Sequence, residues 1–223
     1  MERLLLACQT LEAELQNLLP TGIELRVLDQ GLHRSPDQLR QRLQREIDTA
    51  RADEILLAYG LCGNGILGIS SGRARLVVPR VDDCIPLLLG SAVRYREELQ
   101  REPGTYWLSL GWIQHGTDPF REYQRCREKY GEHTARWIAH EMMKGYRRLV
   151  LIDTGACPLT RIRPYAREFA RFFALRYEEM SGSSTLLRAL LAPATDSSGF
   201  VVLEPGQSLS ADKFLPGLGV ANR

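Results

Sequence analysis

The chain has no apolar run near the length of a membrane-spanning helix, which needs about 18 residues. Its first apolar segment, residues 4–7, is too short for the core of a secretory signal, and no small-residue cleavage site follows it. A strong excess of one charge is also missing, because the net charge is +2 and the arginines of residues 40–46 are interleaved with other residue types. We therefore expect a cytoplasmic protein that binds neither membranes nor nucleic acids.

Cysteine is scarce as well, with five residues in a chain of 223, an odd number that does not suit a framework of disulfides. In a chain without an export signal, we expect these thiols to be reduced and to serve packing, metal binding or catalysis. The hydrophobic fraction of 44% and the charged fraction of 25% are ordinary for a globular protein, which argues against disorder or a coiled coil.

Short apolar runs that read as strands alternate with segments of helical periodicity. The predicted strands are residues 3–8, 23–28, 55–58, 75–79, 105–110, 149–152 and 200–203. Helices are expected at residues 12–19, 36–51, 119–144 with a break at Gly131, 165–175 and 186–191, with a further helix through residues 87–89. This alternation predicts an α/β fold with one or more mostly parallel sheets and flanking helices.

The length suits one α/β unit over residues 1–206, followed by a tail at residues 207–223. A faint internal echo links residues 55–65 with residues 149–158, because both run from a strand into a glycine-containing turn with a cysteine. The unit could therefore consist of two similar βαβ lobes, about residues 1–103 and 104–206, that face a cleft. Chance similarity between two strand ends explains the echo as well.

Four cysteines, Cys8, Cys62, Cys84 and Cys157, each follow within a few residues of a predicted strand. In an open parallel sheet the carboxyl ends of the strands share one edge, and ligands bind there. The pattern therefore predicts a site lined by thiols. The fifth cysteine, Cys126, lies between charged residues in a predicted helix and receives no role.

Cys62 stands in a glycine-rich turn with Gly60, Gly63, Asn64 and Gly65. Such a turn can adopt positive φ angles and converge backbone N–H groups on an anion, a cofactor or a thiolate. It lacks the Gly-Lys-Ser/Thr ending of a phosphate loop. We interpret the four neighbours as cofactor-binding residues and Cys62 as a candidate nucleophile, although a tight turn around a buried thiol would have the same sequence.

Cys84 follows the two carboxylates Asp82 and Asp83, which would oppose ionisation of a free thiol and so suit a metal ligand better than a nucleophile. The alternative is that one aspartate caps the next helix while Cys84 packs as a small apolar residue. Asp83 is also a candidate acid or base. His33, in another loop after a strand, could be a fourth ligand or could simply bond to the backbone.

Cys8, Cys62 and Cys84 together could hold zinc with one position open, or an iron-sulfur cluster with one free iron. Their wide spacing means that only the fold could assemble such a site. The aromatic residues Tyr59, Tyr106, Trp107 and Trp112 could wall a pocket for a flat or apolar ligand, or they could be part of the core.

Several motifs resemble an uncharacterised family catalogued as domain of unknown function 1638. The matching segments are residues 28–33, Pro36, 47–48, 59–65, 78–80, 83–85, 89–91, Tyr95 and 104–107, within a resemblance that spans about residues 4–206. The resemblance implies cysteines at positions 8, 62 and 84 and a link to corrinoid-dependent methyl transfer. Members carry His-Asp-Cys where this chain has Asp82-Asp83-Cys84, so a metal role of that histidine does not transfer.

These residues are compatible with three different functions. The first is a protein with zinc or an iron-sulfur cluster on Cys8, Cys62 and Cys84, an enzyme or accessory factor of one-carbon metabolism whose partner is a small molecule or a protein of a corrinoid system. The second is a metal-free thiol enzyme with Cys62 as nucleophile. The third is a module without catalytic activity that binds a small ligand. The sequence makes no prediction of oligomeric state.

Overall fold

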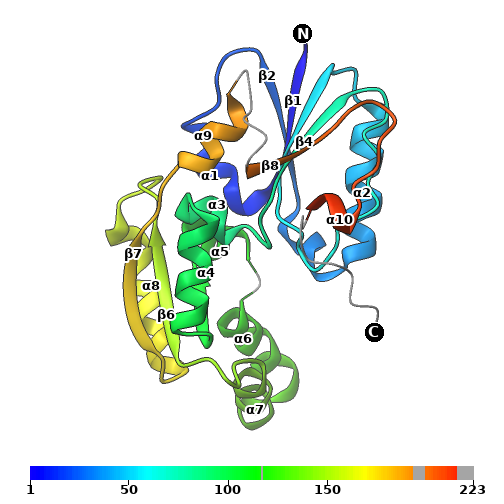
Figure 1. Ribbon diagram of the computed structural model, residues 1–223. Coiled ribbons are helices and arrows are strands. Elements are labelled where there is room, and N and C mark those ends of the chain that lie inside the picture. Colours follow the sequence, from blue (N-terminus) through cyan, green and yellow to red (C-terminus); the bar gives the residue numbers. More distant parts are fainter. Residues whose placement is uncertain (117, 193–198, 215–223) are drawn as a thin grey trace.

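The computed structural model describes residues 1–116, 118–192 and 199–214 and contains two mostly parallel sheets with flanking helices, which confirms the predicted α/β class (Figure 1). The strands are β1 (Arg3–Cys8), β2 (Ile23–Leu28), β3 (Glu54–Ala58), β4 (Arg75–Pro79), β5 (Thr105–Leu108), β6 (Arg148–Asp153), β7 (Arg176–Ser181) and β8 (Phe200–Leu203). The α-helices are α1 (Glu12–Gln16), α2 (Pro36–Thr49), α3 (Ile85–Leu89), α4 (Ala92–Arg101), α5 (Leu110–His115), α6 (Pro119–Tyr130), α7 (Glu132–Met142), α8 (Leu159–Phe172), α9 (Thr185–Leu191) and α10 (Ala211–Phe214).

The larger sheet has the strand order β2-β1-β3-β4-β8, in which the first four strands are parallel and β8 runs antiparallel at the edge. The chain passes from β1 to β2 on one side and later places β3 on the other side of β1. The connections therefore diverge between the carboxyl ends of β1 and β3. Such a topological switch point is where open α/β sheets form their ligand crevices.

Both faces of the larger sheet are covered by helices, so its central strands are apolar on both sides. Leu4 and Leu6 of β1 share a core with α2, whose buried residues Leu39, Leu43 and Ile47 recur at the four-residue spacing expected of a helix face. Leu5 and Ala7 point to the opposite core, with α1, α3 and α9. Pro36 begins α2 directly after Ser35, which confirms the predicted start of this helix.

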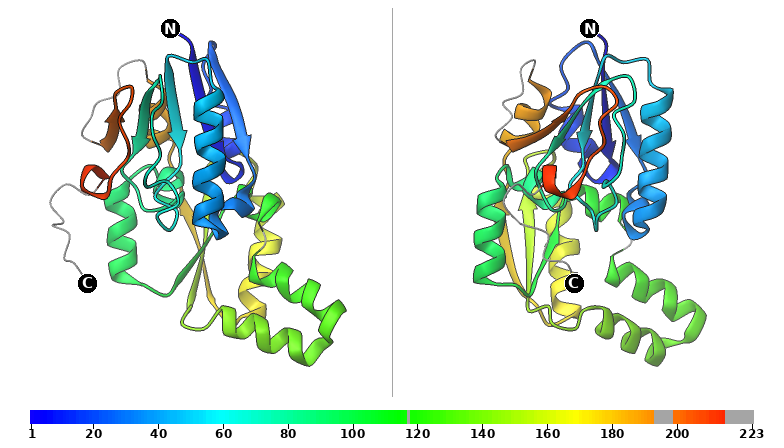
Figure 2. Two further views of the ribbon diagram at one scale, coloured as in Figure 1. Left: turned by 90° about the vertical axis from the view of Figure 1, so that its right-hand side faces the viewer. Right: turned by 45° about the vertical axis from the view of Figure 1, so that its right-hand side comes forward.

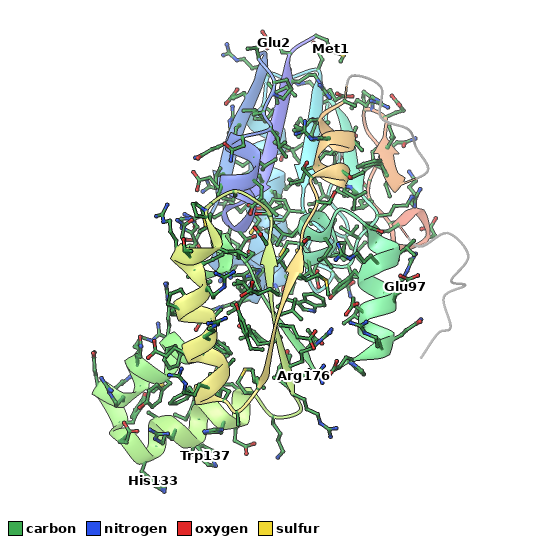
Figure 3. All side chains as sticks on the ribbon, turned by 90° about the vertical axis from the view of Figure 1, so that its left-hand side faces the viewer. Met1, Glu2, Glu97, His133, Trp137 and Arg176 are labelled. Atoms are coloured by element: carbon green, nitrogen blue, oxygen red, sulfur yellow. The ribbon has the colours of Figure 1, made fainter. Side chains whose placement is uncertain are left out.

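The smaller sheet is parallel, in the order β5-β6-β7. One of its faces packs on α8 and on the helical pair α6 and α7, which projects away from the rest of the molecule (Figures 1 and 2). The labelled side chains of His133 and Trp137 lie at the outer end of this pair (Figure 3). The other face contributes Trp107, Val150 and Ile152 to the core that contains α1, α3 and α9. The two sheets therefore share one apolar core.

Three features differ from the expected organisation. Residues 200–203 form β8 in the larger sheet, so the two sheets do not divide the chain simply near residues 103 and 104. The expected tail is ordered at residues 207–214, where Leu209 and Phe214 are buried; the rest of that tail lies outside the described residues. Finally, β7, α4, α5 and α10 occur where we expected no such element, and the strand expected to reach residue 110 ends at Leu108.

None of the helices in the described part of the chain is long and apolar enough to cross a membrane. The cytoplasmic location itself stays a prediction.

Candidate functional site

A cavity of about 280 Å³ lies at the carboxyl edge of β1 to β4, at the switch point between β1 and β3. We call it the thiol pocket. The predicted residues that line it are Cys8, His33, Cys62, Gly63, Asp83 and Cys84, and the fold thus brings together the three thiols that the sequence singled out. Trp112 of α5, which follows the first strand of the smaller sheet, completes the wall.

Each of the three thiols follows a different parallel strand. Cys8 is the last residue of β1, Cys62 lies in the loop after β3, and Cys84 follows β4 and immediately precedes α3. Burial is the main cause that raises the pKa of all three thiols, to about 12 for Cys62. Negative charge on Cys8 would raise the pKa of Cys62 and Cys84 further, as would the carboxylate of Asp83. Burial therefore favours the neutral form of all three thiols.

The loop that carries Cys62 has left-handed backbone at three successive residues. The φ angles of Cys62, Gly63 and Asn64 are 47°, 66° and 69°. Positive φ is uncommon for a residue with a Cβ and concentrates at functional sites, where surrounding structure holds the strain. The backbone N–H of Cys62 donates to the carbonyl oxygen of Asp82 at 2.9 Å. This bond fixes the thiol in place and leaves the Cys62 N–H unavailable for an anion.

Two of the four loop residues that we expected to bind a cofactor have close packing contacts. A Cβ at Gly60 would lie 2.5 Å from the backbone nitrogen of Asp83, and one at Gly65 would lie 2.9 Å from Leu39. These two glycines allow the loop to approach its neighbours closely. Of the four, Gly63 lines the thiol pocket, and Asn64 supplies a carbonyl oxygen for the N–H of Leu67.

Asp83 reaches the pocket but already has a partner on each carboxylate oxygen. Oδ1 accepts the backbone N–H of Ile85 at the start of α3, and Oδ2 accepts the hydroxyl of Tyr95, both at 2.8 Å. Burial nevertheless raises the pKa of Asp83 above its ordinary value. A carboxyl group in this state can carry a proton, in addition to fixing the start of α3. Asp82 is exposed and does not line the pocket.

His33 both contacts the backbone and lines the thiol pocket. Its Nδ1 lies 2.5 Å from the carbonyl oxygen of Gln30. Because a carbonyl oxygen only accepts hydrogen bonds, this contact assigns the proton to Nδ1 and leaves Nε2 with a free lone pair. Histidine ligands of metals are commonly oriented by such a bond from the other ring nitrogen. The ring of Trp112 packs edge-on against His33, with 5.3 Å between centroids.

Two polar atoms of the pocket wall, Nε2 of Gln30 and the hydroxyl oxygen of Tyr59, are buried and have no hydrogen-bond partner among the described residues. Trp112 differs from them, because its indole N–H lies close enough to the Cys84 thiol to lower the pKa of that thiol. Buried polar groups usually have partners, so the two donors around one cavity suit a bound molecule or ordered water with acceptor atoms. We overlooked Gln30 in the sequence, although it follows the end of β2 as the cysteines follow their strands.

The aromatic residues expected to wall a pocket divide between two cavities. Tyr59 and Trp112 line the thiol pocket. Tyr106 and Trp107 line a neighbouring cavity, also of about 280 Å³, which shares Trp112 and Asp83 with it.

The two remaining cysteines lie elsewhere. Cys157 lies beside Pro158 after β6 and does not line the thiol pocket, so the structure does not bring it to the other thiols. Cys126 is buried in the core between α6, α7 and α8. Among the described residues, no three His, Cys, Asp or Glu side chains already stand close enough together to hold a metal ion.

The donors of the thiol pocket nevertheless have the chemistry of a soft-metal site. Three thiols and an imidazole nitrogen are ligands that zinc and iron-sulfur clusters accept. Binding would require the thiols to lose their protons and rotate toward a common point.

Comparison with known proteins gives one match. A family model described as protein of unknown function (DUF1638) matches residues 27–191. This range is narrower than the resemblance noted in the sequence; it contains His33, Cys62 and Cys84 but not Cys8. Neither the curated proteins nor the solved structures give a match.

Proposed function

Because the chain belongs to the DUF1638 family, whose function is unknown, we propose a function from the thiol pocket itself: Cys8, Cys62 and Cys84 hold a soft metal centre, zinc or an iron-sulfur cluster, that binds a small molecule. The convergence of three thiols from three separate strands at the switch point carries this proposal. His33 Nε2 is the further donor. Three protein thiolates leave one position on a zinc ion, or on one iron of a cluster, for the small molecule.

The protonation state of the thiols favours a metal centre over a metal-free thiol enzyme. With a pKa of about 12, only about one Cys62 thiol in 100,000 is ionised at neutral pH, and the thiolate is the reactive form. Cys62 therefore lacks the depressed pKa of an activated nucleophile. A metal ion would supply the positive charge that the pocket lacks, since a coordinating thiol is deprotonated outright.

The hydrogen-bond donors of the pocket wall that lack a partner support the binding of a small molecule with acceptor atoms beside the metal centre. Gln30 Nε2 and the Tyr59 hydroxyl can each donate a hydrogen bond to it. A cavity of about 280 Å³ is at the lower end of ligand pockets, so the molecule is small. Asp83, with its raised pKa, is the group that would exchange a proton with it.

The family resemblance extends the proposal to one-carbon metabolism linked to corrinoid-dependent methyl transfer. The cavity is far too small to enclose a corrinoid ring. In this proposal the corrinoid stays on a partner protein of the methyl-transfer system, and the thiol pocket binds a small methyl donor or acceptor.

The decisive experiment is metal analysis of protein purified without oxygen, with its absorption spectrum, followed by titration of the metal-free protein with zinc. The triple variant Cys8→Ser/Cys62→Ser/Cys84→Ser is compared with Cys126→Ser/Cys157→Ser, which removes the two thiols outside the pocket. We expect the wild type and the double variant to bind one metal centre per chain and the triple variant to bind none. Equal binding by both variants would refute the assignment, as would wild-type protein that takes up neither zinc nor iron.

The same samples distinguish the metal-free thiol enzyme. Rapid alkylation of Cys62 at neutral pH in protein shown to contain no metal would favour that alternative. Slow alkylation, accelerated at alkaline pH, is what the raised pKa of Cys62 predicts.

A further inference from the structure

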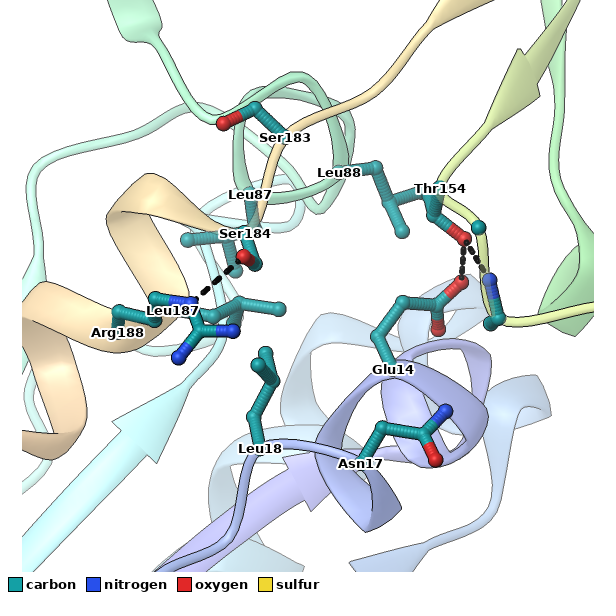
Figure 4. Close-up of a pocket in the computed structure, with 12 residues that line it drawn as sticks. Glu14, Asn17, Leu18, Leu87, Leu88, Thr154, Ser183, Ser184, Leu187 and Arg188 are labelled. Atoms are coloured by element: carbon teal, nitrogen blue, oxygen red, sulfur yellow. Dashed lines mark hydrogen bonds between the residues drawn. The ribbon is translucent and has the colours of Figure 1, made fainter.

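A second cavity, of about 410 Å³, lies between α1, α3, α9 and the loop after β6 (Figure 4). Its wall is more polar than that of the thiol pocket. We call it the junction cavity. It is lined by Glu14 and Asn17 near α1, by residues of α3, by residues 154–156 after β6, and by Ser183, Ser184 and Arg188 at α9. The carboxyl end of β6 in the smaller sheet therefore opens onto it, as the ends of β1 to β4 open onto the thiol pocket.

Glu14 is the unusual residue of this cavity. Its side chain is buried, with 6% of its surface exposed, and Oε1 accepts the hydroxyl of Thr154 at 2.7 Å. The other oxygen, Oε2, has no partner among the described residues. A buried carboxylate oxygen without a donor from another residue is costly, so Oε2 suits a ligand that donates a hydrogen bond to it.

Arg188 lies across the cavity from Glu14 (Figure 4). Its Nε donates to the hydroxyl of Ser184 at 3.0 Å, a bond that holds the guanidinium beside the cavity. Arg188 is not a partner of Glu14 Oε2. One wall therefore presents an unsatisfied acceptor with negative charge, and the opposite wall presents a cation whose planar donors suit a carboxylate.

We propose that the junction cavity is a second binding site, which takes a small molecule with an ammonium group at one end and a carboxylate at the other. The ammonium group donates to Oε2 of Glu14, and the carboxylate pairs with Arg188 and the hydroxyl of Ser184. Apolar side chains such as Leu18 and Leu87 lie between these ends and suit a short methylene linker. This inference does not depend on a metal in the thiol pocket.

The opposite charges of the two walls disfavour ligands that carry only one charged group. A plain amine would satisfy Glu14 but leave Arg188 without an anion, and a plain carboxylate would place its charge near Glu14. A ligand with both groups satisfies both walls at once. Its two charge-assisted hydrogen bonds also offset the loss of its hydration.

The test uses isothermal titration calorimetry of the full chain at neutral pH with glycine, β-alanine and 4-aminobutyrate, which separate the two charges by increasing distance. Butylamine and butyrate are the matched controls with one charge each. We expect at least one of the three zwitterions to bind at least about tenfold more tightly than both controls. Equal affinity for butylamine or butyrate would overturn the proposal, and so would a lack of binding by all three zwitterions.

Variants locate the binding. Glu14→Gln keeps the shape and the acceptor for Thr154 but loses the charge, and Arg188→Gln changes an exposed residue. Each substitution should weaken the binding of the zwitterion by about tenfold or more, because each removes a charge-assisted hydrogen bond. Arg167→Gln, on α8 and outside the cavity, should bind like the wild type. Unchanged affinity in both cavity variants would refute the site.

Discussion

At the scale of single residues, the chemistry of both cavities depends on buried side chains with polar atoms that have no hydrogen-bond partner among the described residues. Oε2 of Glu14 and Nε2 of Gln30 are buried polar atoms without a partner among the described residues. Cys62 is held with a φ of 47°, which costs conformational free energy. Natural sequences accept such costs mainly at functional sites, so these residues identify the sites better than the volume of either cavity does.

Gly60 determines how closely the Cys62 loop approaches Asp83. The Cβ of an alanine at position 60 would lie 2.5–2.7 Å from three backbone atoms of Asp83, which is too close for real atoms. We expect Gly60→Ala to lower the free energy of unfolding by about 1–3 kcal/mol and to weaken zinc binding, because it pushes Cys62 away from Cys84. Urea denaturation and zinc titration measure the two effects. Gly199→Ala, with no atom near its Cβ, is the control, and equal losses in both variants would contradict the argument.

The burial of Glu14 predicts the sign of a pH dependence in the stability of the folded protein. Burial raises its pKa in the folded protein above the ordinary value of 4.5. The folded state therefore favours the protonated form, so this contribution to stability is complete below pH 4.5 and is lost as the pH rises through the raised pKa. The melting temperature of Glu14→Gln, minus that of the wild type, should thus increase from pH 4.5 upward and then level off. A difference that is flat or falls with pH would show that Glu14 is not desolvated.

At the scale of helices and strands, apolar patterning predicted most of the elements that bury apolar side chains, but it missed β7. The residues of β7, Arg176–Ser181, include Glu178 and Glu179, and none of the six is fully buried. Arginines on other elements hold these acids, and Arg163 and Arg148 lie far from them in the sequence. A strand stabilised at its edge by ion pairs has no two-residue apolar alternation, so period-based reasoning could not find it.

The start of α8 shows a second limit of prediction from the sequence pattern. We expected a helix from residue 165, after Pro164, but α8 begins at Leu159 and contains Pro164 in its second turn. Proline is tolerated best in the first turn, where N–H groups have no helical partner, whereas Pro164 in the second turn removes the bond that would run back to the carbonyl of Thr160. A proline therefore marks the neighbourhood of a helix start, and the buried face of Ile162 and Ala166 decides where the helix begins.

Arg148 is the central cation of the smaller sheet. It is fully buried, donates to Thr105, and forms ion pairs with Glu98, Glu102 and Glu178, which join β6 to α4 and β7. Arg148→Met would leave these carboxylates without their shared counter-charge, and we expect it to cost about 3–5 kcal/mol of unfolding free energy.

The control is Arg101→Met, which removes an exposed partner of the same Glu98 and should change stability by less than about 0.5 kcal/mol. Guanidinium denaturation of both variants makes the comparison. Similar effects of the two substitutions would mean that burial does not set the strength of this network.

At the scale of the whole molecule, the thiol pocket is assembled from both sheets. The sequence placed Cys8, Cys62, Cys84 and His33 after strands, and the rule for parallel sheets put those strand ends on one edge. Trp112 follows β5 of the other sheet, and no local pattern indicates that it would cover the thiols. Its position depends on how the two sheets pack on their shared core, which is a property of tertiary contacts alone.

Gly111, next to Trp112, is a close contact beside the pocket between α5, which follows the smaller sheet, and the segment that follows β1 of the larger sheet. It lies in α5 against Thr10, whose hydroxyl donates to the thiol of Cys8 at 3.1 Å, and a Cβ at position 111 would overlap the carbonyl oxygen of Thr10. Gly111→Ala must therefore move α5, and Trp112 with it, away from the thiols. We expect Cys8 and Cys62 to be alkylated faster than in the wild type, because greater exposure to water also removes the main cause of their raised pKa.

Mass spectrometry of alkylated peptides measures the rate at each cysteine separately. Cys126 lies in a different core and provides an internal control; α5 also packs against that core through Leu110 and Ile113, so only a rise at Cys126 as large as the rise at Cys8 would report general unfolding. A selective increase at Cys8 and Cys62 would show that contact between α5 and the segment after β1 keeps the thiols dry. Equal rates in the variant and the wild type would mean that Trp112 does not close the pocket, and a parallel rise at Cys126 would assign the effect to global unfolding instead.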